Sequence, residues 1–121
     1  MGLLLAIAMA AFPQALVHEW KVNAAAPPSP RVSRWSFAVY ADGKYDFSIG
    51  SHTLVFDEGV ATVAGSTLTL TERDVTGARC TKTARVATYG YRIKGTTLTL
   101  TPVQEPCAWR KAILTAGPLS Y

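Results

Sequence analysis

The chain has few of the residues that usually build metal sites and catalytic centres. Its 121 residues include only two histidines, His18 and His52, and two cysteines that are too far apart for a C-x-x-C pair. It contains no G-x-S-x-G, no H-E-x-x-H and no glycine-rich loop ending in Gly-Lys-Ser or Gly-Lys-Thr. We therefore predict a protein that is not an enzyme and that has no catalytic residue, no metal and no cofactor.

Charged residues are also scarce. They make up 17% of the chain, against ~25% in typical soluble proteins. The net charge of +4 comes from one stretch, residues 72–94, which holds six basic and two acidic side chains. A nucleic-acid binder usually has a denser basic stripe with interleaved aromatic residues, within a recognisable module. We expect a solvated basic face and no nucleic-acid partner.

The chain has no hydrophobic run long enough to span a membrane. Its first eleven residues carry no charge, but a transmembrane helix needs ~20 apolar residues. This run matches the hydrophobic part of a secretory signal, and Ala8-Met9-Ala10 fits an A-x-A cleavage pattern, although no Lys or Arg precedes it. We predict a leader over residues 1–13, a single domain over 14–121 and a location outside the cytoplasm. A cytosolic protein is the alternative.

The two cysteines are Cys80 and Cys107. In an oxidising compartment, an isolated pair of cysteines favours one disulfide bond. Two buried free thiols are the expectation for a cytosolic chain instead. The disulfide and the export of the protein are therefore linked predictions.

One segment of the chain occurs twice. Residues 65–71 read Gly-Ser-Thr-Leu-Thr-Leu-Thr, and residues 95–101 repeat them with Thr in place of Ser. Alternation of leucine and threonine places the leucines on one face of a strand and the hydroxyls on the other. The repeat predicts two equivalent hairpins.

Alternation of apolar and polar residues, interrupted by glycine turns, dominates the rest of the domain. We expect a first strand over residues 16–22 and a last strand over 109–115. The adjacent acids Asp57 and Glu58 are placed in a turn. About eight short strands at this spacing predict a closed antiparallel barrel or a sandwich.

Four segments, residues 16–20, 35–47, 89–100 and 103–110, carry a family likeness. The first reads Leu-Val-His-Glu-Trp, close to a Leu-Val-Gly-x-Trp signature, and the last has a cysteine three residues before an arginine. Together they resemble the calycin superfamily, in particular its small bacterial lipocalin-like domains. The resemblance implies an up-and-down antiparallel barrel of about eight strands.

The same resemblance implies a contact that closes the floor of the barrel. In the family, an arginine of the last strand lies across the tryptophan of the first strand, which here pairs Arg110 with Trp20. A solvated Arg110 is the alternative. His18 stands where the family usually has glycine; a lone inward histidine could ligate haem iron, but a packed core histidine is the expectation.

Strand parity places a largely aromatic set inside the barrel. The candidate lumen residues are Phe37, Tyr45, Phe47, Tyr89 and Tyr91. A barrel of eight strands is either filled by its own side chains or holds one small ligand. One hypothesis is therefore a secreted, monomeric carrier of a small apolar molecule, which enters past the Asp42–Gly43 turn. The alternative is a filled barrel that contacts another macromolecule through its loops or its basic 72–94 face.

Overall fold

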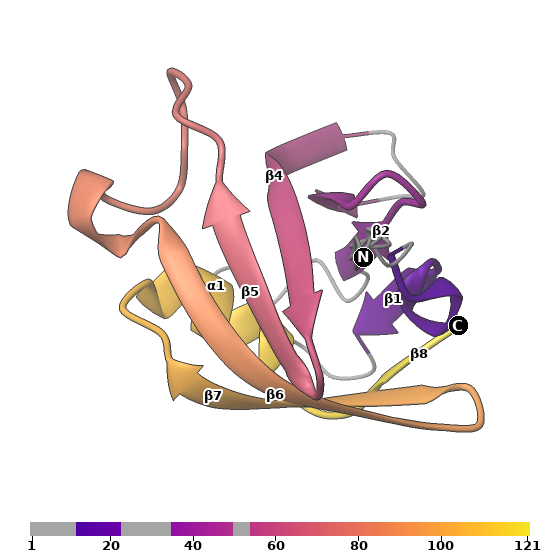
Figure 1. The fold of residues 1–121 in the computed structure, drawn as a ribbon. Helices are drawn as coiled ribbons and strands as arrows, with labels where there is room; N and C mark the ends of the chain where they lie inside the picture. Colours follow the sequence, from indigo (N-terminus) through magenta and orange to yellow (C-terminus); the bar gives the residue numbers. More distant parts are fainter. Residues whose placement is uncertain (1–11, 23–34, 50–53) are drawn as a thin grey trace, which may run out of the picture.

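The computed structural model describes residues 12–22, 35–49 and 54–121. Most of the predicted leader, together with His52, lies outside these residues. Eight antiparallel strands form a closed barrel in which each strand pairs with its neighbours along the chain (Figure 1). The ladder closes where β1 pairs with β8. The predicted all-β, up-and-down antiparallel barrel is confirmed.

The strands differ widely in length, from two residues to eleven. In chain order they are β1 (Glu19–Val22), β2 (Trp35–Val39), β3 (Lys44–Ile49), β4 (Leu54–Ala64), β5 (Thr67–Glu72), β6 (Val86–Lys94), β7 (Thr97–Gln104) and β8 (Leu119–Ser120). The long strands β4, β6 and β7 form one side of the barrel with β5, whereas the seam that closes the barrel consists of the short β1 and β8.

The repeated threonine-leucine segments form β5 and β7, which pair with β6 from opposite sides. Leu68, Leu70 and Leu98 are fully buried, as the alternation predicts. Gly65 and Gly95 occupy the turns before these strands with φ of 61° and 60°, a left-handed conformation that glycine adopts without steric penalty. The two copies therefore form equivalent hairpins, as expected.

The chain enters the barrel through a 3-10 helix, η1 (Gln14–Leu16), and β1 begins only at Glu19. The prediction of a strand from residue 16 is therefore wrong at its first three residues. Leu16 and Trp20 are both fully buried, and Trp20 Nε1 donates a hydrogen bond to the Leu16 carbonyl at 3.0 Å. The helical turn brings this carbonyl under the indole, which satisfies a buried N–H group.

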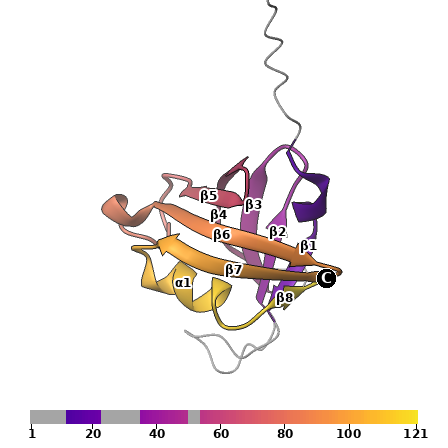
Figure 2. The same cartoon turned by 60° about the horizontal axis from the view of Figure 1, so that its bottom comes forward.

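The predicted last strand over residues 109–115 is wrong, because this segment forms the helix α1 (Ala108–Leu114). Its buried residues, Arg110, Ile113 and Leu114, follow the three- and four-residue spacing of one helix face. Figure 2 shows α1 beside β7, before the chain turns into β8. The barrel is closed by the two residues of β8 rather than by residues 109–115.

β4 continues through Asp57 and Glu58, which were expected in a turn. The pairing of β3 with β4 shifts by one residue, so that Phe47 pairs with Asp57 and Ser48 pairs with Val55. Because side chains alternate between the faces of a strand, such a bulge changes which of them point inward. Asp57 is paired in the same register as Gly59 and has the same parity, so its side chain is buried while that of Glu58 is half-exposed.

Candidate functional site

Most of the candidate lumen residues are packed into the core. Phe37, Tyr45, Phe47 and Tyr89 are each at most 1% exposed. The two phenylalanine rings stack with their centroids 5.2 Å apart, and the Tyr45 ring meets Phe47 edge-on at 5.8 Å. Aromatic pairs at these distances are close-packed, so these rings fill the centre of the barrel.

Tyr91, the fifth candidate, lies at the rim. It is half-buried, and its hydroxyl donates a hydrogen bond to the Gly65 carbonyl at 3.2 Å. Its ring lines a hollow of about 580 Å³, which we call the rim hollow, together with Phe12 and the Asp42–Gly43 turn. The turn expected at the entrance and one expected ligand residue therefore come together here, outside the packed interior.

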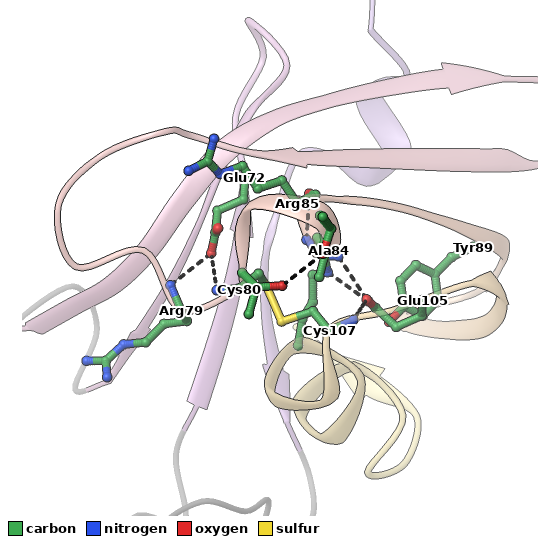
Figure 3. The surroundings of a disulfide bond; sticks show 11 residues. Glu72, Arg79, Cys80, Ala84, Arg85, Tyr89, Glu105 and Cys107 are labelled. Atoms are coloured by element: carbon green, nitrogen blue, oxygen red, sulfur yellow. Dashed lines mark hydrogen bonds and ion pairs between the residues drawn. A yellow bond between two sulfur atoms is a disulfide. The ribbon is translucent and has the colours of Figure 1, made fainter.

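One end of the interior is polar, which the sequence analysis missed. The Glu72 side chain, at the end of β5, is buried, and one of its carboxylate oxygens accepts the N–H groups of Arg79 and Cys80 at 3.0 and 2.9 Å (Figure 3). Asp57 is also buried, and its carboxylate lies within 4.8 Å of that of Glu72. The burial of Glu72 could have been predicted from the sequence, because Glu72 continues the alternation that places Leu68 and Leu70 inside the barrel.

The electrostatics of this end follow from burial. Desolvation and the facing carboxyl of Glu72 raise the pKa of Asp57 from 3.8 to about 8. The backbone N–H of Glu58 and the guanidinium of Arg110 act in the opposite direction but more weakly. Burial also raises the pKa of the Tyr45 hydroxyl above its ordinary value of 10. The carboxyl of Asp57 consequently titrates far above the normal range for aspartate.

Arg110 projects from α1 into the same end, where its guanidinium is fully buried. Nε and one terminal nitrogen donate to the two carboxylate oxygens of Glu105 at 2.7 and 2.8 Å. The terminal nitrogens also donate to the carbonyls of Arg85 and Ala84, each at 2.8 Å. Glu105 in turn accepts a hydrogen bond from the Tyr89 hydroxyl. The bidentate pair joins α1 to the residue that follows β7, and the two carbonyl bonds join α1 to the segment before β6.

Arg110 and Trp20, which were expected to stack, have separate contacts within the described residues. Arg110 lies in a helix rather than in the last strand, so its guanidinium reaches Glu105 instead of the indole. Trp20 packs edge-on against His18 and Tyr121, with centroids 5.3 and 5.0 Å away. His18 itself stacks on Tyr121 at 3.5 Å. The seam between β1 and β8 is therefore covered by aromatic rings, and His18 is a packing residue there.

The predicted disulfide is confirmed. Cys80 and Cys107 are bonded, with their Cα atoms 5.5 Å apart (Figure 3). The bond joins the loop between β5 and β6, which contains the short helix η2 (Lys82–Ala84), to the residue just before α1. The Cys80 sulfur lies near Asp57 and Glu72, but a disulfide sulfur is not the thiolate that binds metals. This cluster therefore offers two carboxylates, fewer protein ligands than zinc usually takes.

A second hollow, of about 480 Å³, is lined by residues in and next to β3, β4 and β5, and we call it the β3–β5 hollow. Tyr40 and Val60 are its exposed apolar residues, and the Tyr40 hydroxyl donates to Asp46 at 2.6 Å. Side chains of both charges surround them. The lining residues are Tyr40, Lys44, Tyr45, Asp46, Glu58, Gly59, Val60, Thr71, Glu72 and Arg73.

The stretch 72–94 is less basic in space than in sequence. Arg73 pairs with Glu58 at 2.7 Å, and Arg85 pairs with Asp74 at 2.6 Å. The guanidinium of Arg79 lies 5.1 Å above the ring of Phe56. Since Glu58, from outside the stretch, neutralises Arg73 and Asp74 lies against Arg85, this stretch does not form the uniform basic face that its composition suggested.

A scan against protein-family models finds no match to the chain, and comparisons with curated proteins and with solved structures find none either. The barrel is compatible with a calycin-like architecture, as the sequence resemblance implied. Within residues 12–22, 35–49 and 54–121, no helix is long and apolar enough to cross a membrane.

Proposed function

We propose that this protein is a filled-barrel interaction domain that binds another macromolecule on its outer surface. The observation that carries the proposal is the packing of Phe37, Tyr45, Phe47 and Tyr89, each at most 1% exposed, in the space where a carrier would hold its ligand. A barrel of eight strands is just wide enough to be filled in this way. The binding surface we propose is the β3–β5 hollow.

The β3–β5 hollow suits a polypeptide partner. Tyr40 and Val60 are 39% and 51% exposed, which leaves apolar surface for an anchor side chain. The Arg73–Glu58 ion pair and Lys44, which pairs with Asp42, border this apolar surface with polar groups of both charges. Exposed aromatic and arginine side chains next to apolar surface are typical of protein interfaces. The strands close into a barrel, which reduces the length of strand edge available for self-pairing and supports a monomer.

We place the protein outside the cytoplasm, in the lipocalin-like group of barrels that its sequence resembles. The Cys80–Cys107 bond supports this compartment, because structural disulfides persist mainly in oxidising environments. The closed antiparallel barrel supports the structural kinship.

The test is site-specific photo-crosslinking in the exporting cell. A benzoyl-phenylalanine group replaces Val60 in one variant and Val103, which is 70% exposed on β7, in the control variant. We expect one crosslinked product from position 60 that excess unlabelled protein suppresses and that excess Val60→Arg protein does not. Equal crosslinking from both positions, or no product from position 60, would refute binding at the β3–β5 hollow.

In a second candidate function, the protein binds a small apolar ligand at the rim of the barrel instead of in the lumen. It is favoured by the rim hollow, whose volume of about 580 Å³ falls in the ~300–1,000 Å³ range of ligand pockets. Titration with an environment-sensitive apolar fluorophore tests it. Saturable binding by the parent that a Tyr91→Trp variant abolishes supports this candidate, whereas no binding by the folded parent removes it.

A further inference from the structure

The polar end of the barrel contains two buried oxygen atoms that lack a hydrogen-bond partner among the described residues, Asp57 Oδ2 and Glu72 Oε1. The two side chains are 5% and 2% exposed, so solvent does not readily supply the missing donors. An ionised carboxylate accepts hydrogen bonds but cannot donate them. Two facing carboxylates therefore leave both oxygens unsatisfied, which is costly in a protein interior. A single proton between them satisfies both.

The neighbouring backbone decides which carboxyl keeps its charge. Glu72 Oε2 already accepts two N–H groups, from Arg79 and Cys80. Hydrogen bonds to a carboxylate stabilise its ionised form, so Glu72 holds the negative charge and Asp57 carries the proton. Burial beside Glu72 raises the pKa of Asp57 to about 8, in agreement with this assignment.

The other groups that face the pair do not replace the proton. Arg110, from α1, is the cation on this side, but its guanidinium is engaged by the Glu105 carboxylate and by two carbonyls. Tyr45, from β3, stays neutral because burial raises its pKa, and among the described residues its hydroxyl makes no hydrogen bond to either carboxylate. Tyr89, from β6, donates to Glu105. Arg85, whose carbonyl accepts the Glu72 N–H, pairs with Asp74. Loss of the shared proton would therefore leave two adjacent, buried negative charges beside arginines that already have other carboxylate partners.

Glu72 is also one of the links between the barrel and the loop of residues 73–85, and it holds the middle of the loop, whereas Arg110 holds the carbonyls of Ala84 and Arg85 at its end. Within that loop, the N–H groups of Arg79 and Cys80 are both held by its carboxylate, next to the disulfide (Figure 3). Repulsion from an ionised Asp57 would push the Glu72 carboxylate away from the position in which it accepts these two bonds. The proton and the attachment of the loop are thus coupled through one side chain.

We propose that Asp57 and Glu72 share one proton that keeps the 73–85 loop attached to the barrel, and that loss of this proton in alkaline solution releases the loop. The loop remains covalently tethered through Cys80. The direction follows from linkage, because a carboxyl whose pKa is raised by folding stabilises the folded form at low pH and loses this contribution as the pH rises towards its folded pKa.

Amide hydrogen exchange measured by NMR tests the release. The protection factors of the Arg79 and Cys80 amides are compared between about pH 6 and about pH 9, since a group with a pKa near 8 is ~90% ionised at the upper value. Protection factors already correct for the intrinsic pH dependence of exchange. We expect them to fall about tenfold in the parent, while the β5 amides stay protected. Unchanged protection at both loop amides would overturn the proposal.

Matched variants assign the effect to the pair. In Asp57→Asn the side-chain amide donates to Glu72 and cannot ionise, so the loop amides should keep their protection at both pH values. Glu58→Gln changes the next residue of β4, whose side chain is half-exposed and pairs with Arg73, and it should retain the pH effect of the parent. If Asp57→Asn does not fold, Glu72→Gln provides the same test, because its amide group can accept from the loop and donate to Asp57. Loss of protection in the Asn or Gln variant equal to that of the parent would overturn the proposal.

A direct titration separates the proton from a bound cation. The side-chain carboxyl carbon of Asp57 should titrate near pH 8 in ¹³C NMR spectra of the parent. This titration should be the same in the presence of EDTA and of millimolar Ca²⁺ or Mg²⁺. A shift of the Asp57 and Glu72 carbons at neutral pH on addition of either cation would show that a metal ion occupies the pair, and it would refute the shared proton.

Discussion

Replacement of Arg110 by methionine is expected to destabilise the barrel by about 3–5 kcal/mol, the usual loss when one partner of a buried ion pair is removed. Methionine keeps the length and the apolar stem of the side chain. It removes the donors that reach the Glu105 carboxylate and the carbonyls of Arg85 and Ala84. The Glu105 side chain, only 1% exposed, would then be a buried charge whose remaining partners are the Tyr89 hydroxyl and a backbone N–H group.

Two further variants divide this loss into charge and geometry. Arg110→Lys keeps the positive charge but cannot make the bidentate pair or reach both carbonyls, so we expect an intermediate loss of about 2 kcal/mol. The double variant Arg110→Met with Glu105→Gln removes both charges and should recover at least about 1 kcal/mol relative to Arg110→Met.

Urea denaturation, followed by tryptophan fluorescence and by far-UV circular dichroism, measures these free energies of unfolding. Coincident transitions by the two probes would establish two-state behaviour for each variant. A loss below about 1 kcal/mol for Arg110→Met, typical of surface substitutions, would refute the assignment of a buried, fully engaged guanidinium. Failure of the double variant to recover stability would show that the carbonyl bonds, and not the Glu105 charge, dominate.

The remaining predictions concern packing and the disulfide. Trp20→Ala should cost about 3–5 kcal/mol in the same denaturation assay, as for other buried tryptophans; a loss below about 1 kcal/mol would mean that Trp20 is not buried. Gly59→Ala should strongly destabilise the folded barrel and broaden its amide NMR spectrum, because the added Cβ would lie 2.6 Å from the Tyr45 hydroxyl oxygen. A melting temperature equal to that of the parent would contradict this. Replacing both Cys80 and Cys107 by alanine should lower stability by about 3–4 kcal/mol, the loop-closure value for their separation, whereas an unchanged urea midpoint would show that the bond does not constrain the unfolded chain.

Local alternation was enough to predict most of the barrel. The leucines of the two threonine-leucine segments face inward because successive side chains of a strand point to opposite faces, whatever the strand packs against. The turns at Gly65 and Gly95 could be predicted as well, since glycine adopts positive φ freely. The disulfide followed from the cysteine count and the presumed compartment.

The polar end of the barrel could be predicted only in part. Glu72 continues the inward parity of β5, so its burial was readable from the sequence. The burial of Asp57 was not, because Asp57 and Glu58 were expected in a turn, and only the pairing of β3 with β4 shows that the strand continues through them. The pairing of Arg110 with Glu105 also joins two segments whose contact depends on the direction of α1.

Strand periodicity is a local property, so the amino-acid sequence was sufficient to predict an all-β barrel with inward leucines and aromatic rings. The three-dimensional packing was needed to tell a filled barrel from a hollow one, since the difference depends on how Phe37, Tyr45 and Phe47 share one volume. Tertiary contacts also account for the helical conformation of residues 108–114. A segment of seven residues is too short to form a stable helix by local propensity alone. The buried contacts of Arg110 and Ile113 stabilise this helix.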